Sequence, residues 1–137
     1  MPKKKRTFVD SGVLLTAFRG IETEAEDAFK ILEDPNREFV SSIFVRMELL
    51  PKAIYHRNEK EIQFYEAFFE AVSIWVRFTE DLLQAGLEEA KRGGIAAMDA
   101  LHVMAAASSN ADELVTTEGP FKPIHRTNLM RVVCIHD

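Results

Sequence analysis

The stretch TFVDSGVLLTAF, residues 7–18, determines how the fold is interpreted. Its first three residues form a short apolar run that is typical of a buried strand, and this run ends abruptly at Asp10. A helix is then expected from Val13 to Phe18, with Gly20 as its stop. A buried strand that passes into a helix is typical of an α/β protein, and here it places a carboxylate at the end of the strand.

The rest of the chain continues this alternation of strands and helices. Strands are expected at residues 39–40, 74–76, 114–115 and 132–135, and helices at 23–33, 43–54, 59–72, 79–93 and 96–108. Pro51 predicts a kink or a break in its helix, and Leu82, Leu83 and Leu87 are expected to face the core. The order predicts one domain over residues 1–137, with a mostly parallel sheet and helices on both faces.

Composition excludes several classes of protein. The net charge of −5 argues against a surface devoted to nucleic acid, although Lys3 to Arg6 form a basic run that either contacts phosphates or is a solvated tail. No apolar run approaches the about 20 residues that cross a bilayer, so no membrane association is expected. Cys134 is the only cysteine, which fits a reducing compartment and a cytoplasmic location.

Four acidic residues are candidates for a shared site: Asp10, Glu48, Asp99 and Glu118. All four fall near the carboxyl ends of expected strands, where sites form in open parallel sheets. Carboxylates brought together repel one another, so they stay ionised only if a cation compensates. Oxygen ligands alone favour Mg²⁺ or Mn²⁺ over zinc, and such a centre is suited to metal-assisted hydrolysis of phosphodiesters.

These residues occur within motifs that resemble a known family. The segments FVDSGVLL, the helix with Glu48, AAMDALHVMAAA, LVTTEGPF and the final RVVCI follow in the order and approximate spacing of a PIN domain. The sequence is especially similar to the VapC-like ribonuclease toxins of toxin–antitoxin pairs. The resemblance implies a sheet ordered 3-2-1-4-5, Mg²⁺- or Mn²⁺-dependent cleavage of RNA, a homodimer and inhibition by a cognate antitoxin.

The resemblance also implies roles for the four acids. Asp10 and Asp99 would bind the metal directly, and Glu48 would be a ligand or a partner of metal-bound water. Glu118 stands where the family usually has Asp, so it is a ligand, a water-mediated contact or a vestigial acid.

Smaller polar residues flank these motifs. Thr116 would act on a ligand or on phosphate, and Ser11 would do the same or cap the first helix. Gly12 stands where the family more often has a polar side chain. His102 lies three residues after Asp99, and we expect it to be packed or to support a ligand rather than to bind the metal.

Other interpretations remain open at this stage. The main alternative is a non-catalytic PIN-like module that binds RNA or protein through a weakened metal site, because of Glu118. The chain lacks the acidic pair and the lysine that a phosphoacceptor receiver needs. It also lacks the second Asp that a phosphatase of related fold would have two residues after Asp10. The helix at 59–72 carries more large apolar residues than one core face needs, which predicts that another chain covers part of it.

Overall fold

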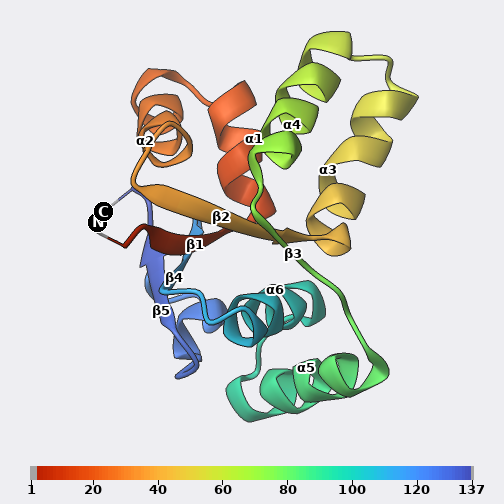
Figure 1. The fold of residues 1–137 in the computed structure, drawn as a ribbon, viewed down its shortest axis with the longest axis vertical. Coiled ribbons are helices and arrows are strands. Elements are labelled where there is room, and N and C mark those ends of the chain that lie inside the picture. Colours follow the sequence, from red (N-terminus) through yellow and green to blue (C-terminus); the bar gives the residue numbers. More distant parts are fainter. Residues whose placement is uncertain (1–2, 137) are drawn as a thin grey trace.

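The computed structural model describes residues 3–136, which form a sheet between two layers of helices (Figure 1). The strands are β1 (Lys5–Val9), β2 (Arg37–Ser42), β3 (Ile74–Val76), β4 (Glu113–Thr116) and β5 (Arg131–Cys134). The helices are α1 (Ser11–Arg19), α2 (Glu22–Leu32), α3 (Ile43–Tyr55), α4 (Glu59–Ala71), α5 (Glu80–Gly93) and α6 (Ala97–Ser108). A short 3₁₀ helix, Pro123–Arg126, lies between β4 and β5 and was not expected from the sequence.

The sheet has the order β3-β2-β1-β4-β5, and every neighbouring pair of strands is parallel. Helices α1 to α4 lie on one side of it and α5 and α6 on the other (Figure 1). The predicted fold class and strand order are therefore confirmed. The chain winds one way from β1 to β3 and returns to β4 beside β1, so the winding reverses between the ends of β1 and β4.

The central strands are buried on both faces, which explains their continuous apolar character. Phe8 in β1 lies between Val40 of β2 and Leu114 of β4, and all three side chains are fully buried. Helix α6 packs over β1 and β2 with small residues, among them the buried Ala105 and Ala106. This close packing places the first turns of α6 beside the end of β1.

Pro51 does not break its helix, so the break, one of the two outcomes expected at this residue, is wrong. Helix α3 continues from Ile43 to Tyr55 with Pro51 inside it. Proline cannot donate a hydrogen bond to the carbonyl four residues earlier, that of Met47. Met47 is 57% exposed, so this carbonyl belongs to the side of the helix where water can replace the missing donor.

The expected orientation of α5 is wrong for two of its leucines. Leu83 and Leu87 are 42% and 52% exposed, whereas Gly86 and Glu89 are buried. A Cβ atom at Gly86 would lie 3.1 Å from Cδ2 of Leu101 on α6, so α5 approaches α6 through its smallest residue. Close approach of the two helices, rather than apolar spacing, therefore decides which face of α5 is inside.

Three of the four aromatic side chains of α4 are buried within this chain, and the fourth, Phe64, is partly buried. Tyr65 is fully buried, Phe68 and Phe69 are 7% and 5% exposed, and Phe68 packs on Phe39 of β2 with ring centroids 5.5 Å apart. The excess of apolar residues on this helix therefore gives no reason to expect a covering partner.

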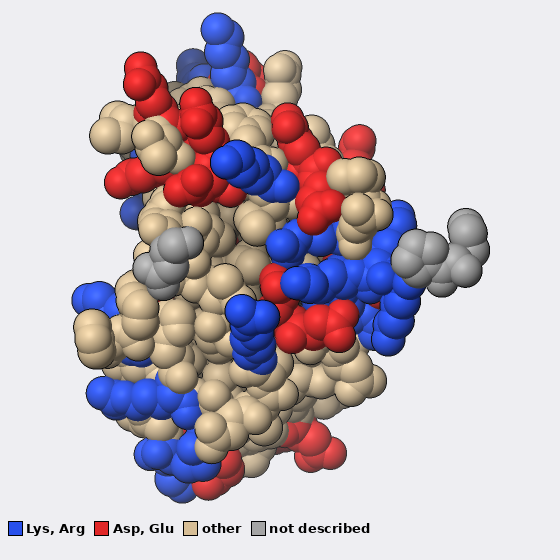
Figure 2. Space-filling model, turned by 90° about the vertical axis from the view of Figure 1, so that its left-hand side faces the viewer, with Lys and Arg blue, Asp and Glu red and all other residues tan. Residues whose placement is uncertain are grey.

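The basic run near the start of the chain lies at the amino end of the strands. Lys5 and Arg6 belong to β1 rather than to a tail, and they pair with Glu113 at 3.4 Å and Glu38 at 2.6 Å. Figure 2 shows basic and acidic side chains interspersed on this end of the molecule. No helix within residues 3–136 is both long enough and apolar enough to cross a bilayer.

Candidate metal centre

Asp10 lies at the carboxyl end of β1, directly before α1. Its backbone N–H donates to the carbonyl of Val115 in β4, and its own carbonyl accepts from Val13 in α1. The residue is only 6% exposed, and its Oδ2 accepts a 2.8 Å hydrogen bond from the Thr116 hydroxyl. Asp10 is thus a fixed carboxylate at the point where the winding of the sheet reverses.

Glu48 and His102 reach Asp10 from helices on opposite sides of the sheet. Ser42 caps α3 by accepting from the N–H of Phe44, so Glu48 falls in the second turn of that helix. Nε2 of His102, on α6, lies 2.6 Å from Oε1 of Glu48 and 3.8 Å from Oδ1 of Asp10. Each of these three residues offers a ligand atom, and the three atoms lie within 4.8 Å of one another.

Asp99 and Glu118 belong to the same neighbourhood but not to this three-atom group. Asp99 lies in the first turn of α6, and its charge interacts with those of Asp10, Glu118 and Glu48. Glu118 follows β4, and its backbone N–H donates to the hydroxyl of Thr116 at 3.1 Å. Its carbonyl accepts a 2.9 Å hydrogen bond from Nε2 of His125, which fixes the loop rather than the carboxylate.

The carboxylates perturb one another in the way expected of a cation site. Burial, and then the charge of Asp10, raise the pKa of Asp99 from 3.8 to about 6. Burial also raises the pKa of Asp10, although the hydrogen bond from Thr116 opposes this. Burial is also the largest influence on Glu48 and acts in the same direction, but the interactions with His102 and the hydrogen bond from Ser11 together outweigh it and lower the pKa of Glu48. A divalent cation would offset the burial and the repulsion that raise the pKa values of Asp10 and Asp99, so the residues present fit a metal.

Ser11, Gly12 and Thr116 shape the loop contacts around Asp10. Ser11 is the first residue of α1 rather than its cap, which is Asp10. A Cβ atom at Gly12 would lie 2.6 Å from Oγ1 of Thr117, so glycine lets α1 begin close to the loop after β4. Thr116 is fully buried and joins the Asp10 carboxylate to the backbone of Glu118.

The contact between His102 and Glu48 could not be found from the sequence. The two residues are 54 positions apart and lie on helices that cover different faces of the sheet. The available signal was the spacing of three residues from Asp99, which places His102 on the side of α6 that faces the end of β1.

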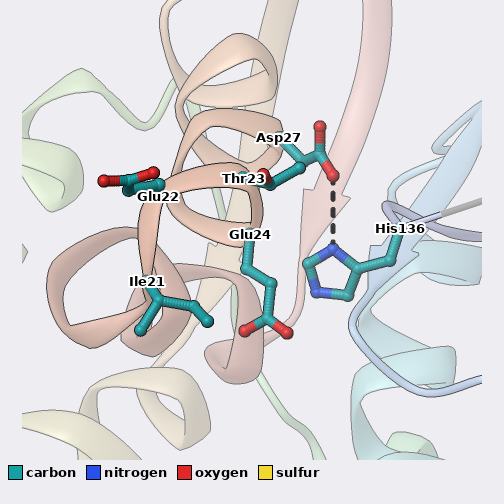
Figure 3. A pocket seen from close by; sticks show the side chains of 6 residues that line it. All are labelled: Ile21, Glu22, Thr23, Glu24, Asp27 and His136. Atoms are coloured by element: carbon teal, nitrogen blue, oxygen red, sulfur yellow. Dashed lines mark hydrogen bonds and ion pairs between the residues drawn. The ribbon is translucent and has the colours of Figure 1, made fainter.

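A hollow near the start of α2 is separate from this centre. It has a volume of about 720 Å³ and is lined by Ile21, Glu22, Thr23, Glu24, Asp27 and His136. Figure 3 shows Asp27 directed at His136, and their Oδ2 and Nδ1 atoms are 3.5 Å apart. The hollow shares no residue with the carboxylate cluster, so its size gives no reason to move the candidate site there.

The family of the chain follows from a match that covers most of its length. Residues 7–124 match the model of the PIN domain family. The chain belongs to the PIN domain family. The match includes Asp10, Glu48, Asp99 and Glu118. A comparison with curated proteins found no match to this PIN domain.

Solved structures of similar fold include three toxin–antitoxin complexes. VapBC2 from Rickettsia felis, bound to a DNA fragment from its promoter, has a TM-score of 0.70 at 19% identity, and the match covers 93% of this chain and 97% of that chain. A toxin–antitoxin complex from Klebsiella pneumoniae has a TM-score of 0.70 at 18% identity, and the match covers 94% of this chain and 97% of that chain. VapBC-1 from nontypeable Haemophilus influenzae has a TM-score of 0.71 at 19% identity, and the match covers 96% of this chain and 99% of that chain. At these identities, the likeness establishes the fold.

Proposed function

We propose that this PIN domain protein is a divalent-metal-dependent endoribonuclease and the toxin of a toxin–antitoxin pair. The observation that carries the proposal is the juxtaposition of Asp10 and Glu48 with Asp99 nearby, at the carboxyl edge of a PIN sheet. Such oxygen ligands match the preference of Mg²⁺ and Mn²⁺. The solved structures that match this chain over nearly their whole length support the choice of a toxin, because they come from toxin–antitoxin complexes.

The residues divide the work of holding the metal and presenting the RNA phosphate. Asp10, Glu48 and Asp99 would hold the ion, with Glu118 as a further acidic group at the loop after β4. A bound Mg²⁺ or Mn²⁺ supplies neutralisation of phosphate charge and a water molecule of lowered pKa. Thr116 keeps Asp10 in place through its hydroxyl, and Ser11 and Gly12 begin α1 beside it. The amino end of α1 is suited to a phosphate oxygen, because its first N–H groups have no partners within the helix.

The test is cleavage of a single-stranded RNA and of a DNA of the same sequence, with Mn²⁺, with Mg²⁺ and with a chelator. The wild-type protein should cut the RNA only with metal, and Asp10→Asn should abolish cutting. Asp81→Asn is the matched control, because Asp81 is an exposed aspartate in the first turn of α5, away from the site. Metal-independent cutting, or full activity of Asp10→Asn, would contradict the proposal.

The same variants distinguish the enzyme from a non-catalytic module. Binding of RNA without cleavage under every metal condition would favour the module. Induced expression in a bacterial host tests the toxin role, since the wild type should arrest growth while Asp10→Asn should not. If an adjacent gene encodes a small protein, co-expression of that protein should restore growth.

A further inference from the structure

His102 is a buried imidazole within the candidate centre, where oxygen ligands would be sufficient. It is 1% exposed, and its ring packs against Phe8 with ring centroids 5.4 Å apart. The ring therefore has little freedom to turn. Among residues 3–136, only its Nε2 lies close to polar side-chain atoms, those of Glu48 and Asp10.

The position of the proton on this imidazole follows from its two nitrogens. Nε2 faces a carboxylate oxygen at 2.6 Å, which a lone pair would repel, so Nε2 must carry a proton and donate it. Nδ1 is buried and has no hydrogen-bond partner among residues 3–136. The neutral form with its proton on Nε2 satisfies this arrangement, because an unprotonated Nδ1 needs no acceptor.

The same arrangement disfavours direct binding of metal by His102. A ligating Nε2 would have to give up its proton, and the neutral ring would then carry that proton on Nδ1. Histidines that bind metals almost always donate from the second nitrogen to a carboxylate, a carbonyl or water. No residue in the described part of the chain offers such an acceptor to Nδ1.

Glu48, by contrast, needs an anchor. Its side chain is 33% exposed, and it extends from α3 toward Asp10. A free glutamate at such a position samples several rotamers. Because metal binding restricts it to one of them, the lost conformational entropy lowers the affinity for the metal. The 2.6 Å hydrogen bond from the rigid ring of His102 fixes one oxygen of Glu48 before the metal arrives. Thr116 does the same for one oxygen of Asp10.

We infer that His102 is a positioning residue that preorganises Glu48 for the metal by donating from Nε2, and that it does not bind the metal itself. The inference rests on the proposed metal site. Two neutral donors from different elements, Thr116 and His102, thereby each hold one oxygen of one carboxylate.

The experiment measures Mn²⁺ affinity by calorimetry in three variants and examines the bound ion by pulsed electron paramagnetic resonance. His102→Leu removes the donor, and it should weaken Mn²⁺ binding about 10- to 100-fold, the usual effect of removing an outer partner of a ligand. His102→Gln places an amide N–H near the position of Nε2, so it should restore affinity to within a few-fold. His56→Gln, at an exposed histidine after α3, is the matched control and should bind as the wild type does.

The resonance spectrum separates a positioning residue from a ligand. The wild-type protein should show no coupling of a directly bound imidazole nitrogen to Mn²⁺. Such a coupling, lost in His102→Gln, would overturn the inference while leaving the proposed metal site intact. Unchanged affinity in His102→Leu would also overturn it. If His102→Leu does not fold, the decision passes to folded His102→Gln, in which a tenfold or greater loss of affinity would overturn the inference. Absence of Mn²⁺ binding by the wild type would instead refute the proposed function, and the inference with it.

Discussion

Thr116 is the residue on which the position of Asp10 depends most directly. Thr116→Val keeps the shape but leaves Oδ2 of the buried Asp10 without its donor. We expect a loss of about 1–3 kcal/mol in the free energy of unfolding, which is the usual cost of an unsatisfied buried polar group. Urea unfolding near neutral pH measures it. Thr116→Ser keeps the hydroxyl and serves as the control, so equal stability of the Val and Ser variants would contradict this role.

Ionised Asp99 should lower the stability of the metal-free protein, while its charge favours metal binding. Its pKa is about 6 in the folded chain against an ordinary 3.8, chiefly because of burial and the charge of Asp10. The folded state therefore binds the proton more tightly than the unfolded state does, and stability falls as pH rises from about 4 to above 6. Asp99→Asn removes this ionisation.

In the presence of a chelator, Asp99→Asn should be more stable than the wild type by on the order of 1 kcal/mol above this range, after allowance for solvent screening at a half-buried group. The gain should be absent at about pH 4, where the wild-type carboxyl is already protonated. Thermal unfolding at both pH values measures the difference. With Mn²⁺ in excess the order should reverse, and a variant that is stabilised equally at both pH values would refute the explanation.

At the scale of elements, the network between α1 and α4 provides a second test. Glu61 of α4 is buried and accepts from Arg19 of α1 at 2.6 Å, and also from Tyr65. Burial raises the pKa of Glu61, but the hydrogen bonds from Tyr65 and Arg19 outweigh it and lower the pKa below 4.5. A lowered folded pKa means that this stabilisation is present above 4.5 and is lost as pH falls through the folded value.

Glu61→Gln should therefore cost about 1–2 kcal/mol at neutral pH and progressively less as the wild-type carboxyl protonates. Acid unfolding followed by circular dichroism should therefore place the midpoint of the Glu61→Gln variant at a higher pH than that of the wild type. Glu66→Gln is the matched control on the same helix, because the ion pair of Glu66 with Arg46 is 3.8 Å long and exposed. An exposed pair contributes about 0–1 kcal/mol, so equal effects of the two substitutions would show that the α1–α4 network is unimportant.

The positions of the elements were predictable because their chemistry is local. The apolar run before Asp10 locates β1, and Thr79 locates α5 because its hydroxyl accepts from the N–H of Leu82. The exposed Leu87 was not predictable, because its environment depends on how closely Gly86 lets α5 approach α6. Local signals thus determine where a helix begins, whereas packing determines which of its faces is buried.

At the scale of the whole molecule, the same distinction applies to the site. The alternation of strands and helices predicts a parallel sheet but not its order, which came from the resemblance to a family. The position of Asp10 followed from the end of a strand, since the carboxyl edge of a parallel sheet is where sites form. The contact of Glu48 with His102 needs α3 and α6 to meet across that edge. Such a contact exists only once the strand order is fixed.

The exposed surface of the whole molecule places the expected dimer interface on a different helix from the one that the sequence indicated. Dimer formation stays a prediction, but Tyr65, Phe68 and Phe69 of α4 are buried within the chain and give no reason to place the contact on that helix. Exposed apolar residues occur instead on α3, where Ile43, Met47 and Ile54 are 52%, 57% and 57% exposed. Their spacing of four and seven residues places them on one face of the helix.

We therefore expect light scattering to give twice the chain mass, and Met47→Lys to shift the protein towards the monomer, because a charge on this face would be buried at the interface. Ile21→Lys is the matched control, since Ile21 is 76% exposed at the start of α2, away from α3. A wild-type monomer at every concentration would refute the dimer. A dimer that both substitutions weaken equally would instead show that the α3 face is not the interface, because only a change on the contact surface should act selectively.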